Sequence, residues 1–404
     1  MFKETKKRIV TSNSKFVQTI TTASNYRRQR AKFEDRDLNS ADVCSFDPKQ
    51  ISNIINFAFW ASLELEEGRQ IRGILTIVCP QESPLSLSFQ VPQSLTVKSI
   101  VALTTASPTK ALAIHTGQQG NPEVWGFSQP DQLDCMCIRI TGLGTVLVSL
   151  NKSVIAVIHN GELSIPTNQP DRFTWLRMIS LNFDNSSEFP DKIEKASILL
   201  DIVTAIFKAG HGGALVVLPS HTINIISDID VKYDLGNSNL ISSRLEEFKK
   251  SQQEMVINPN IPDDDRLQLA KLKFESIEYY KRIFRECLVE VGNLSSVDGA
   301  VIIDENFSLY GFGSKLRVTG ESHTKDESVR IIDVLNMNSK RSIKYVKYTD
   351  LGGTRHQSAA RFVQKHNDVW VFVVSQDGHV TLFTWLISEA QVLGLKNLNH
   401  LMWD

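Results

Sequence analysis

Long apolar runs are missing from this sequence. No stretch approaches the roughly 20 consecutive apolar residues that a membrane-spanning helix needs, and the first residues lack the apolar core of a secretory signal peptide. Internal repeats and low-complexity tracts are missing as well, so a solenoid or propeller is not predicted. We therefore expect a globular protein that lies in the cytoplasm and does not contact a membrane.

Cysteine is scarce and net charge is close to zero. The five cysteines are scattered, and without a secretory signal an odd set favours reduced thiols over a disulfide framework. Cys135 and Cys137 alternate as residues of a strand do, but no second Cys/His pair stands at zinc spacing, so no metal site is predicted there. The formal net charge of −1 gives no overall attraction to nucleic acid.

What the sequence does contain suffices for two domains. It has 404 residues, of which 42 % are hydrophobic and 22 % charged, the composition of an ordinary globular protein. Shifts in composition predict a basic arm at 1–45, a strand-rich α+β domain at 46–185 and an α/β domain at 186–404. The last of these is expected to be a mixed sheet flanked by helices.

The arm at 1–45 begins with a strongly basic run. Nine Lys or Arg residues and a single acidic residue, Glu4, precede residue 33. Such a run can approach DNA, RNA or an acidic partner, so a nucleic-acid-binding regulator is one possible function. Few aromatic residues stand among the charges, which is unlike a platform for stacking single-stranded bases. A solvated arm, ordered only by a partner, is the other interpretation.

Short β-like runs separated by proline, glycine and Asn160-Gly161 turns fill the next domain. The predicted strands are 71–78, 85–91, 95–103, 111–115, 135–140, 146–150 and 154–158. No motif in this part identifies a ligand. Because the domain precedes the one that carries chemistry, a sensor or regulatory role is expected.

Helical periodicity from residue 191 leads into a strand at 214–218. Residues 238–292 predict an inserted helix pair, whose second helix begins after Pro262 with an acidic first turn. The apolar stripe of that helix predicts core packing or a contact within the pair. The remaining elements expected are a hairpin at 300–312, a short helix at 328–335, strands at 369–374 and 380–385, and a closing helix or packed tail from 386.

The stretch Gly352-Gly353-Thr354-Arg355-His356 is the most informative one. A glycine turn that leads into a helix presents unpaired N–H groups and the positive end of the helix dipole, which together suit a phosphate. Thr354 adds a hydroxyl, Arg355 a planar fork of donors, and His356 a further donor when suitably oriented or protonated. A plain helix cap with a surface arginine is the alternative.

A second stretch, Asp298-Gly299-Ala300, places a carboxylate immediately before an apolar β-branched run, which predicts an acidic side chain at the start of a buried strand. A Gly-Ala strand precedes it, and Ser375 follows the glycine-led motif. In this order, the motifs between residues 190 and 390 resemble those of the diadenylate cyclase family.

The resemblance implies an activity. In that family, two ATP molecules bind to two facing domains, and the 3′-hydroxyl of each attacks the α-phosphate of the other, which yields cyclic di-AMP and two pyrophosphates. Asp298, Gly299 and Ala300 would be the catalytic motif, and Asp298 would bind a divalent metal or orient the attacking hydroxyl. Mg²⁺ or Mn²⁺ is the implied cofactor, ATP the substrate, and a face-to-face homo-oligomer the active form.

The resemblance also implies a set of nucleotide-binding residues and a second metal ligand. The phosphates would contact Gly353, Thr354, Arg355, His356, Gln357 and Ser375, and Asp377 would be the further metal ligand.

The chain departs from the family pattern at three positions. Gln357 stands where a second arginine is usual, Val297 where a histidine is frequent, and Gln376 where one of two acidic residues is expected. The loss of one cation beside a triphosphate costs about 1–3 kcal/mol of charge-assisted bonding. A catalytically weakened nucleotide-binding sensor on the same fold is therefore an alternative function.

Overall fold

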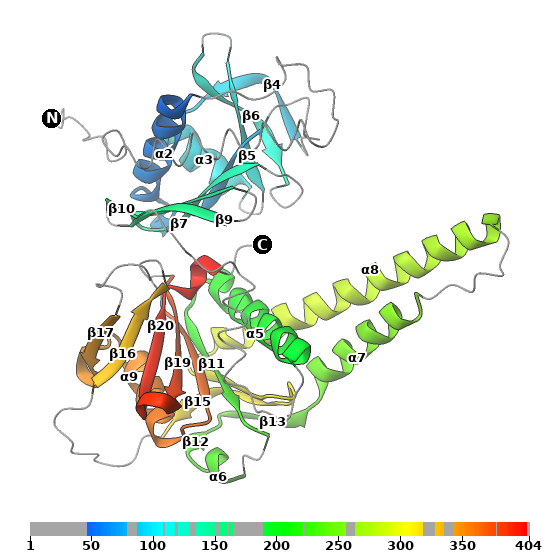
Figure 1. The fold of residues 1–404 in the computed structure, drawn as a ribbon, viewed down its shortest axis with the longest axis vertical. Coiled ribbons are helices and arrows are strands. Elements are labelled where there is room, and N and C mark those ends of the chain that lie inside the picture. Colours follow the sequence, from blue (N-terminus) through cyan, green and yellow to red (C-terminus); the bar gives the residue numbers. More distant parts are fainter. Residues whose placement is uncertain are drawn as a thin grey trace. The chain divides into compact units, whose positions relative to one another are not determined.

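The computed structural model describes residues 47–78, 87–107, 110–117, 120–129, 135–150, 153–159, 161–164, 189–220, 223–255, 263–317, 328–334, 343–376 and 378–401. The chain divides into two compact units with the main boundary between Asp171 and Arg172 (Figure 1). Each unit holds a mixed sheet with helices, which confirms the predicted α/β class. The predictions made for the basic arm and for Asp377 fall outside the described residues.

Unit 1 is built on an eight-stranded sheet of order β10-β9-β8-β7-β3-β5-β6-β4, with a small hairpin, β1 and β2, beside it. Its elements are α2 (Pro48–Ser62), β1 (Leu65–Glu66), β2 (Arg69–Gln70), β3 (Gly73–Ile77), β4 (Leu87–Ser94), α3 (Val97–Ala106), β5 (Ala111–Thr116), β6 (Pro122–Ser128), β7 (Met136–Gly142), β8 (Thr145–Leu150), β9 (Ser153–His159) and β10 (Glu162–Ser164).

One face of this sheet is covered by α2 and α3. Ile54 and Ile55 of α2 and Ile100 of α3 are fully buried in one core with strand residues such as Leu112. Burial of such side chains contributes roughly 1.5–3 kcal/mol each. The prediction of a strand at 95–103 was wrong, since Thr96 and Ser99 form a capping box that starts α3.

Unit 2 contains a ten-stranded sheet of order β12-β15-β14-β11-β18-β19-β20-β16-β17, and β13 pairs with β15. Its strands are β11 (Gly213–Leu218), β12 (Ile229–Asp230), β13 (Tyr233–Ser238), β14 (Ala300–Asp304), β15 (Leu309–Leu316), β16 (Ser328–Asp333), β17 (Ile343–Lys347), β18 (Trp370–Val374), β19 (Val380–Leu386) and β20 (Gln391–Lys396). Its helices are α5 (Phe189–Ala209), α6 (Ile223–Ile226), α7 (Leu240–Gln253), α8 (Asp263–Asn293) and α9 (Thr354–Lys365), with short 3₁₀ turns at Leu294–Ser296, Tyr348–Asp350, Ile387–Glu389 and Leu398–Leu401.

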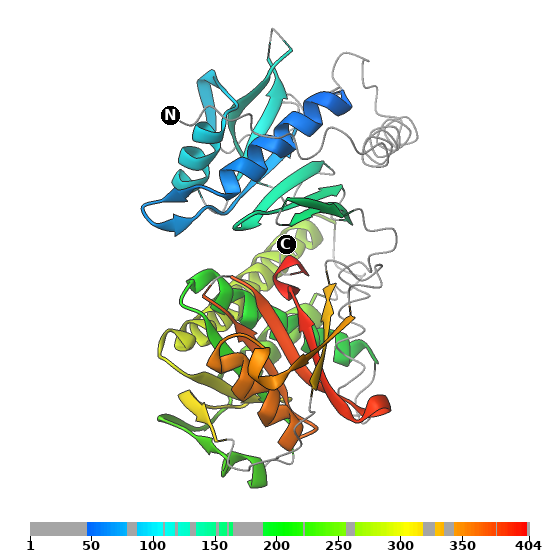
Figure 2. The same ribbon diagram turned by 90° about the vertical axis from the view of Figure 1, so that its left-hand side faces the viewer.

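Helices cover both faces of this sheet. Helix α9 lies on one face of the sheet (Figure 2). It buries Phe362 and Val363 in a core that includes Val216 and Phe383. Helix α5 and the inner end of α8 lie on the other face (Figures 1 and 2). Leu215 of β11, which directly precedes Val216, is also fully buried. Because β11 is buried on both faces, its sequence is continuously apolar rather than alternating.

The inserted pair α7 and α8 extends away from the sheet (Figure 1). The apolar stripe predicted on α8 is buried only near its C-terminal end, at residues such as Phe284 and Leu288, whereas Leu267 and Phe274 are exposed. Within the described residues, no helix combines the length and the apolar character that crossing a membrane requires.

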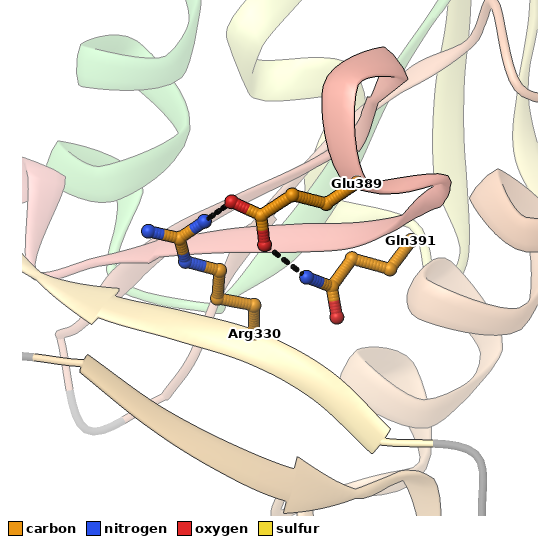
Figure 3. A network of polar contacts seen from close by, with 3 residues as sticks. All are labelled: Arg330, Glu389 and Gln391. Carbon is orange, nitrogen blue, oxygen red and sulfur yellow. Dashed lines mark hydrogen bonds and ion pairs between the residues drawn. The ribbon is translucent and has the colours of Figure 1, made fainter.

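Two further elements differ from the prediction. The helix expected at 328–335 is strand β16, and the segment after 386 contains strand β20, which pairs in parallel with β16. Both strands depend on partners distant in the sequence, which local periodicity does not include. Figure 3 shows the polar contacts beside this pairing. Glu389, in the turn before β20, pairs with Arg330 of β16 and accepts a hydrogen bond from Gln391 of β20.

Phe362→Ala tests the packing of α9. The Phe362 side chain has no exposed surface, and we expect its truncation to lower the free energy of unfolding of unit 2 by about 3–5 kcal/mol. Urea denaturation of this variant and of the neighbouring surface variant Arg361→Ala would measure the difference. Equal midpoints for the two variants would contradict the packing described.

Candidate functional site

Three chain segments that are distant in sequence meet at one edge of the unit 2 sheet. Strand β11 pairs in parallel with β14, and Ala214 lies opposite Ala300 at the start of both. Strand β18 runs antiparallel to β11, so that its last residue, Val374, lies opposite Gly213. The residues just before β11 and β14 and just after β18 therefore gather at the same edge.

Asp298 and Arg355 meet at this edge. The Arg355 Nη2 atom donates to the Asp298 Oδ1 atom at 2.6 Å, although the residues belong to different motifs. The Asp298 side chain is 86 % exposed and the Arg355 side chain 34 %, so the pair lies at the surface, where such an interaction contributes about 0–1 kcal/mol. Both groups can therefore exchange partners at little cost, which suits residues that receive a charged ligand.

Gly299 and Ala300 anchor the backbone next to Asp298 by close packing and burial. Gly299 has φ of +136°, and a Cβ there would stand 2.4 Å from the carbonyl carbon of Gly313 on β15. No other residue fits that contact without moving the backbone. Ala300 is buried at the start of β14. Of the three residues in the predicted catalytic motif, Asp298 is the one with a reactive group exposed to solvent.

Gly212 also belongs to the site, although its role was not apparent from the sequence. Its φ is +68°, and a Cβ there would stand 3.0 Å from the Val374 carbonyl oxygen, 3.2 Å from the Gln376 nitrogen and 3.3 Å from the Arg355 Nη1 atom. The Arg355 guanidinium thus lies against the Gly212 backbone. The glycine cluster that follows α5 was the available signal, but it has the same pattern as an ordinary helix end.

The first turn of α9 is open to solvent. Gly353 is the N-terminal cap, and a Cβ built on Gly352 or Gly353 would have no atom within 4 Å. Thr354 is exposed, and the amide nitrogens of His356 and Gln357 donate to the Gly353 carbonyl. The turn therefore has room for a ligand beside the positive end of the helix dipole.

The Gln357 side chain braces this turn. Its amide nitrogen donates to the carbonyl oxygens of Thr349 and Gly352, each at 3.1 Å. The two N–H groups of that amide are thereby used by the backbone. In this arrangement Gln357 fixes the shape of the glycine turn and supplies no positive charge to it.

His356 lies on the inner side of α9, with its ring edge-on to Phe383 at 6.0 Å between centroids. Burial, and then the positive charges of Lys396 and His379, lower the pKa of His356 to about 4. The imidazole is therefore neutral at pH 7, so His356 adds no positive charge to the phosphate site expected there.

Ser375 closes the turn between β18 and β19. Its Oγ atom accepts a hydrogen bond from the His379 amide nitrogen at 3.1 Å, so the hydroxyl is held within this turn. Asp377 lies outside the described residues, so its metal-binding role stays a prediction. No cluster of three metal-ligating side chains occurs within the described part of the chain. Mg²⁺ often takes one or two carboxylates and completes its shell with phosphates and water, which a single exposed Asp298 fits.

The comparison with protein families concerns unit 1. Residues 42–129 match the model of a family described as "Probable sensor domain DACNV". The match covers α2 to β6, and it supports the sensor role expected for this part of the chain. No curated protein and no solved structure shows significant similarity to the chain. The DACNV match does not extend into unit 2, which holds Asp298 and Arg355.

Gly212→Ala tests the contact between Gly212 and Arg355. Gly210 is the matched control, because its φ of +75° imposes similar strain on an alanine while a Cβ there would meet nothing within 4 Å. Each substitution should cost about 1–2 kcal/mol of stability from its backbone conformation. Only Gly212→Ala should displace the Arg355 guanidinium, and thus raise its rate of modification by phenylglyoxal, measured by peptide mass spectrometry. Equal modification in the two variants would argue against the contact.

His356 makes stability depend on pH. Its pKa of about 4 in the folded protein lies below the ordinary value of 6.5, so the unfolded chain binds more protons between these values. The free energy of unfolding should fall as pH drops from about 6.5 towards 4, by on the order of 1–3 kcal/mol. His356→Leu should flatten this dependence in urea unfolding at pH 7 and pH 4.5. An unchanged slope would show that His356 is not held neutral.

Proposed function

We propose that this protein is a diadenylate cyclase that acts in the cytoplasm and is regulated by its N-terminal sensor domain. The observation that carries the proposal is the meeting of Asp298 with Arg355 at one sheet edge, beside an open glycine-led helix N-terminus. The sensor-domain match in residues 42–129 supports it, since the expected architecture places a sensor before the cyclase domain.

The phosphates of ATP would contact the first turn of α9. Thr354 and the first amide groups of the helix donate to them, and Arg355 exchanges its ion pair with Asp298 for a bidentate contact with phosphate oxygens. This exchange frees the Asp298 carboxylate. His356, which is neutral and lies against Phe383, holds the helix in place.

Asp298 would then hold Mg²⁺ or Mn²⁺ and orient the ribose 3′-hydroxyl of the attacking nucleotide. When bound, the divalent ion supplies positive charge between the carboxylate and the phosphates, which otherwise repel each other. The contribution of the protein to such a reaction is positioning and charge neutralisation rather than covalent chemistry.

One copy of the site provides for one nucleotide, whereas cyclic di-AMP needs two. The exposed Asp298 side chain and the open turn at Gly352 and Gly353 leave the site accessible from solvent. We therefore propose that two copies face each other through this edge, in a homo-oligomer that is at least a dimer. Activity then depends on protein concentration if that contact is weak.

A nucleotide-binding sensor without turnover is the second candidate function. It is favoured by the contacts of Gln357, whose amide braces the turn and leaves Arg355 as the charged side chain of the motif. Binding of ATP without formation of cyclic di-AMP would support this candidate over the cyclase.

Asp298→Asn tests the cyclase. The substitution preserves size and exposure but removes the charge, so product formation from ATP and Mn²⁺ should fall by at least about 100-fold, since each 1.4 kcal/mol of lost transition-state stabilisation is tenfold in rate. Mass spectrometry of cyclic di-AMP measures the rate, and Asp368→Asn, at an exposed position in the turn after α9, is the control. A rate unchanged by Asp298→Asn would remove this residue from the mechanism.

A further inference from the structure

An exposed aromatic ring lies on strand β13. Tyr233 is 43 % exposed as a residue, and its ring stacks on the ring of Phe312 from β15 with centroids 4.8 Å apart and an interplanar angle of 19°. The two residues are direct partners across the strands. Phe312 thus holds the Tyr233 ring in a fixed orientation, so that little rotamer freedom is left to lose when a ligand binds.

This ring lies near Val297, the residue before Asp298. A Cβ at Gly313 would stand 3.0 Å from the Val297 Cγ1 atom and 3.3 Å from the Tyr233 Cδ2 atom. Gly313 is also the residue against which Gly299 packs, with 2.4 Å between its carbonyl carbon and a Cβ built on Gly299. The backbone of Gly313 therefore lies between Tyr233 and the segment that carries Asp298.

Glycine permits this approach. Gly311, on the same strand as Gly313, would place a Cβ 2.4 Å from the Tyr233 carbonyl oxygen. A side chain at Gly299 would clash with the backbone of β15, and one at Gly311 would clash with the backbone of β13. Glycine thus lets the strand with the exposed ring and the segment that carries Asp298 pack closely on β15.

A cation also lies beside the ring. The Lys232 Nζ atom lies 5.1 Å from the centroid of the Tyr233 ring. Lys232 is itself exposed, so its ammonium group can move aside at little cost when a flat ligand covers the ring. A planar heteroaromatic base is the class of ligand that stacks on such a ring.

We propose that Tyr233, held by Phe312, is the residue on which the nucleotide base stacks. This inference rests on the proposed function, because the phosphates of the same nucleotide would contact Arg355 and the first turn of α9. Stacking accepts any base, so Tyr233 contributes affinity for nucleotides over free polyphosphates and not a choice between adenine and guanine.

Calorimetric titration with two ligands tests this inference. In the presence of Mn²⁺, Tyr233→Leu should weaken binding of ATP by about 5- to 100-fold and change binding of inorganic tripolyphosphate by less than about twofold. Tyr233→Trp, which keeps an aromatic face, should retain ATP binding. Tyr345→Leu is the matched control, since Tyr345 is an exposed tyrosine on β17, the strand at the other end of the same sheet.

The outcomes separate this inference from the cyclase proposal. ATP binding that is unchanged in Tyr233→Leu, or that falls equally for ATP and tripolyphosphate, would overturn the stacking role. A selective loss of ATP binding in a protein that forms no cyclic di-AMP would support the stacking role and reject the cyclase. A wild-type protein that binds neither ligand would overturn both. Thermal unfolding of each variant shows whether it is folded.

Discussion

The site of this protein depends on the register of β11 with its two neighbours. Because β14 runs parallel to β11, the two strands begin at the same edge, and because β18 runs antiparallel, it ends there. Hydrogen bonds of the sheet therefore bring the turn at Gly212, the carboxylate of Asp298 and the turn at Ser375 together. Helix α9 then supplies Arg355 from the sheet face that it covers.

Charge and burial are divided among the residues of this edge. Asp298 is exposed and its partner Arg355 is a surface cation, so their ion pair contributes little to stability and can be exchanged for ligand contacts. His356, one residue further along, lies against Phe383 with a pKa lowered to about 4. The positive field of the site thus comes from Arg355 and the helix dipole, whereas His356 belongs to the packing of α9.

Close approach of backbone segments also shapes the site. Gly299 and Gly313 bring β14 against β15, and the same contact places Tyr233 of β13 beside the Asp298 segment. A carboxylate, a cationic helix tip and an aromatic ring are then available within one unit. These are the groups that would contact the divalent ion, the phosphates and the base of the nucleotide that we propose as the ligand.

The sequence by itself determined the elements whose signals are local. The periodicity after residue 191, the acidic start of α8 and the continuous apolar run of β14 each depend on neighbouring residues, and the motifs of Asp298 and Arg355 could be recognised for the same reason. The DACNV match in residues 42–129 fits the sensor role expected from domain order.

Only the tertiary structure decided the features that depend on distant partners. Residues 328–333 form a strand because β20 and β17 pair with them, and the ion pair of Arg355 joins two motifs that are 57 residues apart. The neutral state of His356, the bracing role of Gln357 and the position of Tyr233 likewise follow from groups brought near by folding. Periodicity and capping act over a few residues, whereas burial, electrostatic fields and cross-strand contacts act between segments that are far apart in the sequence.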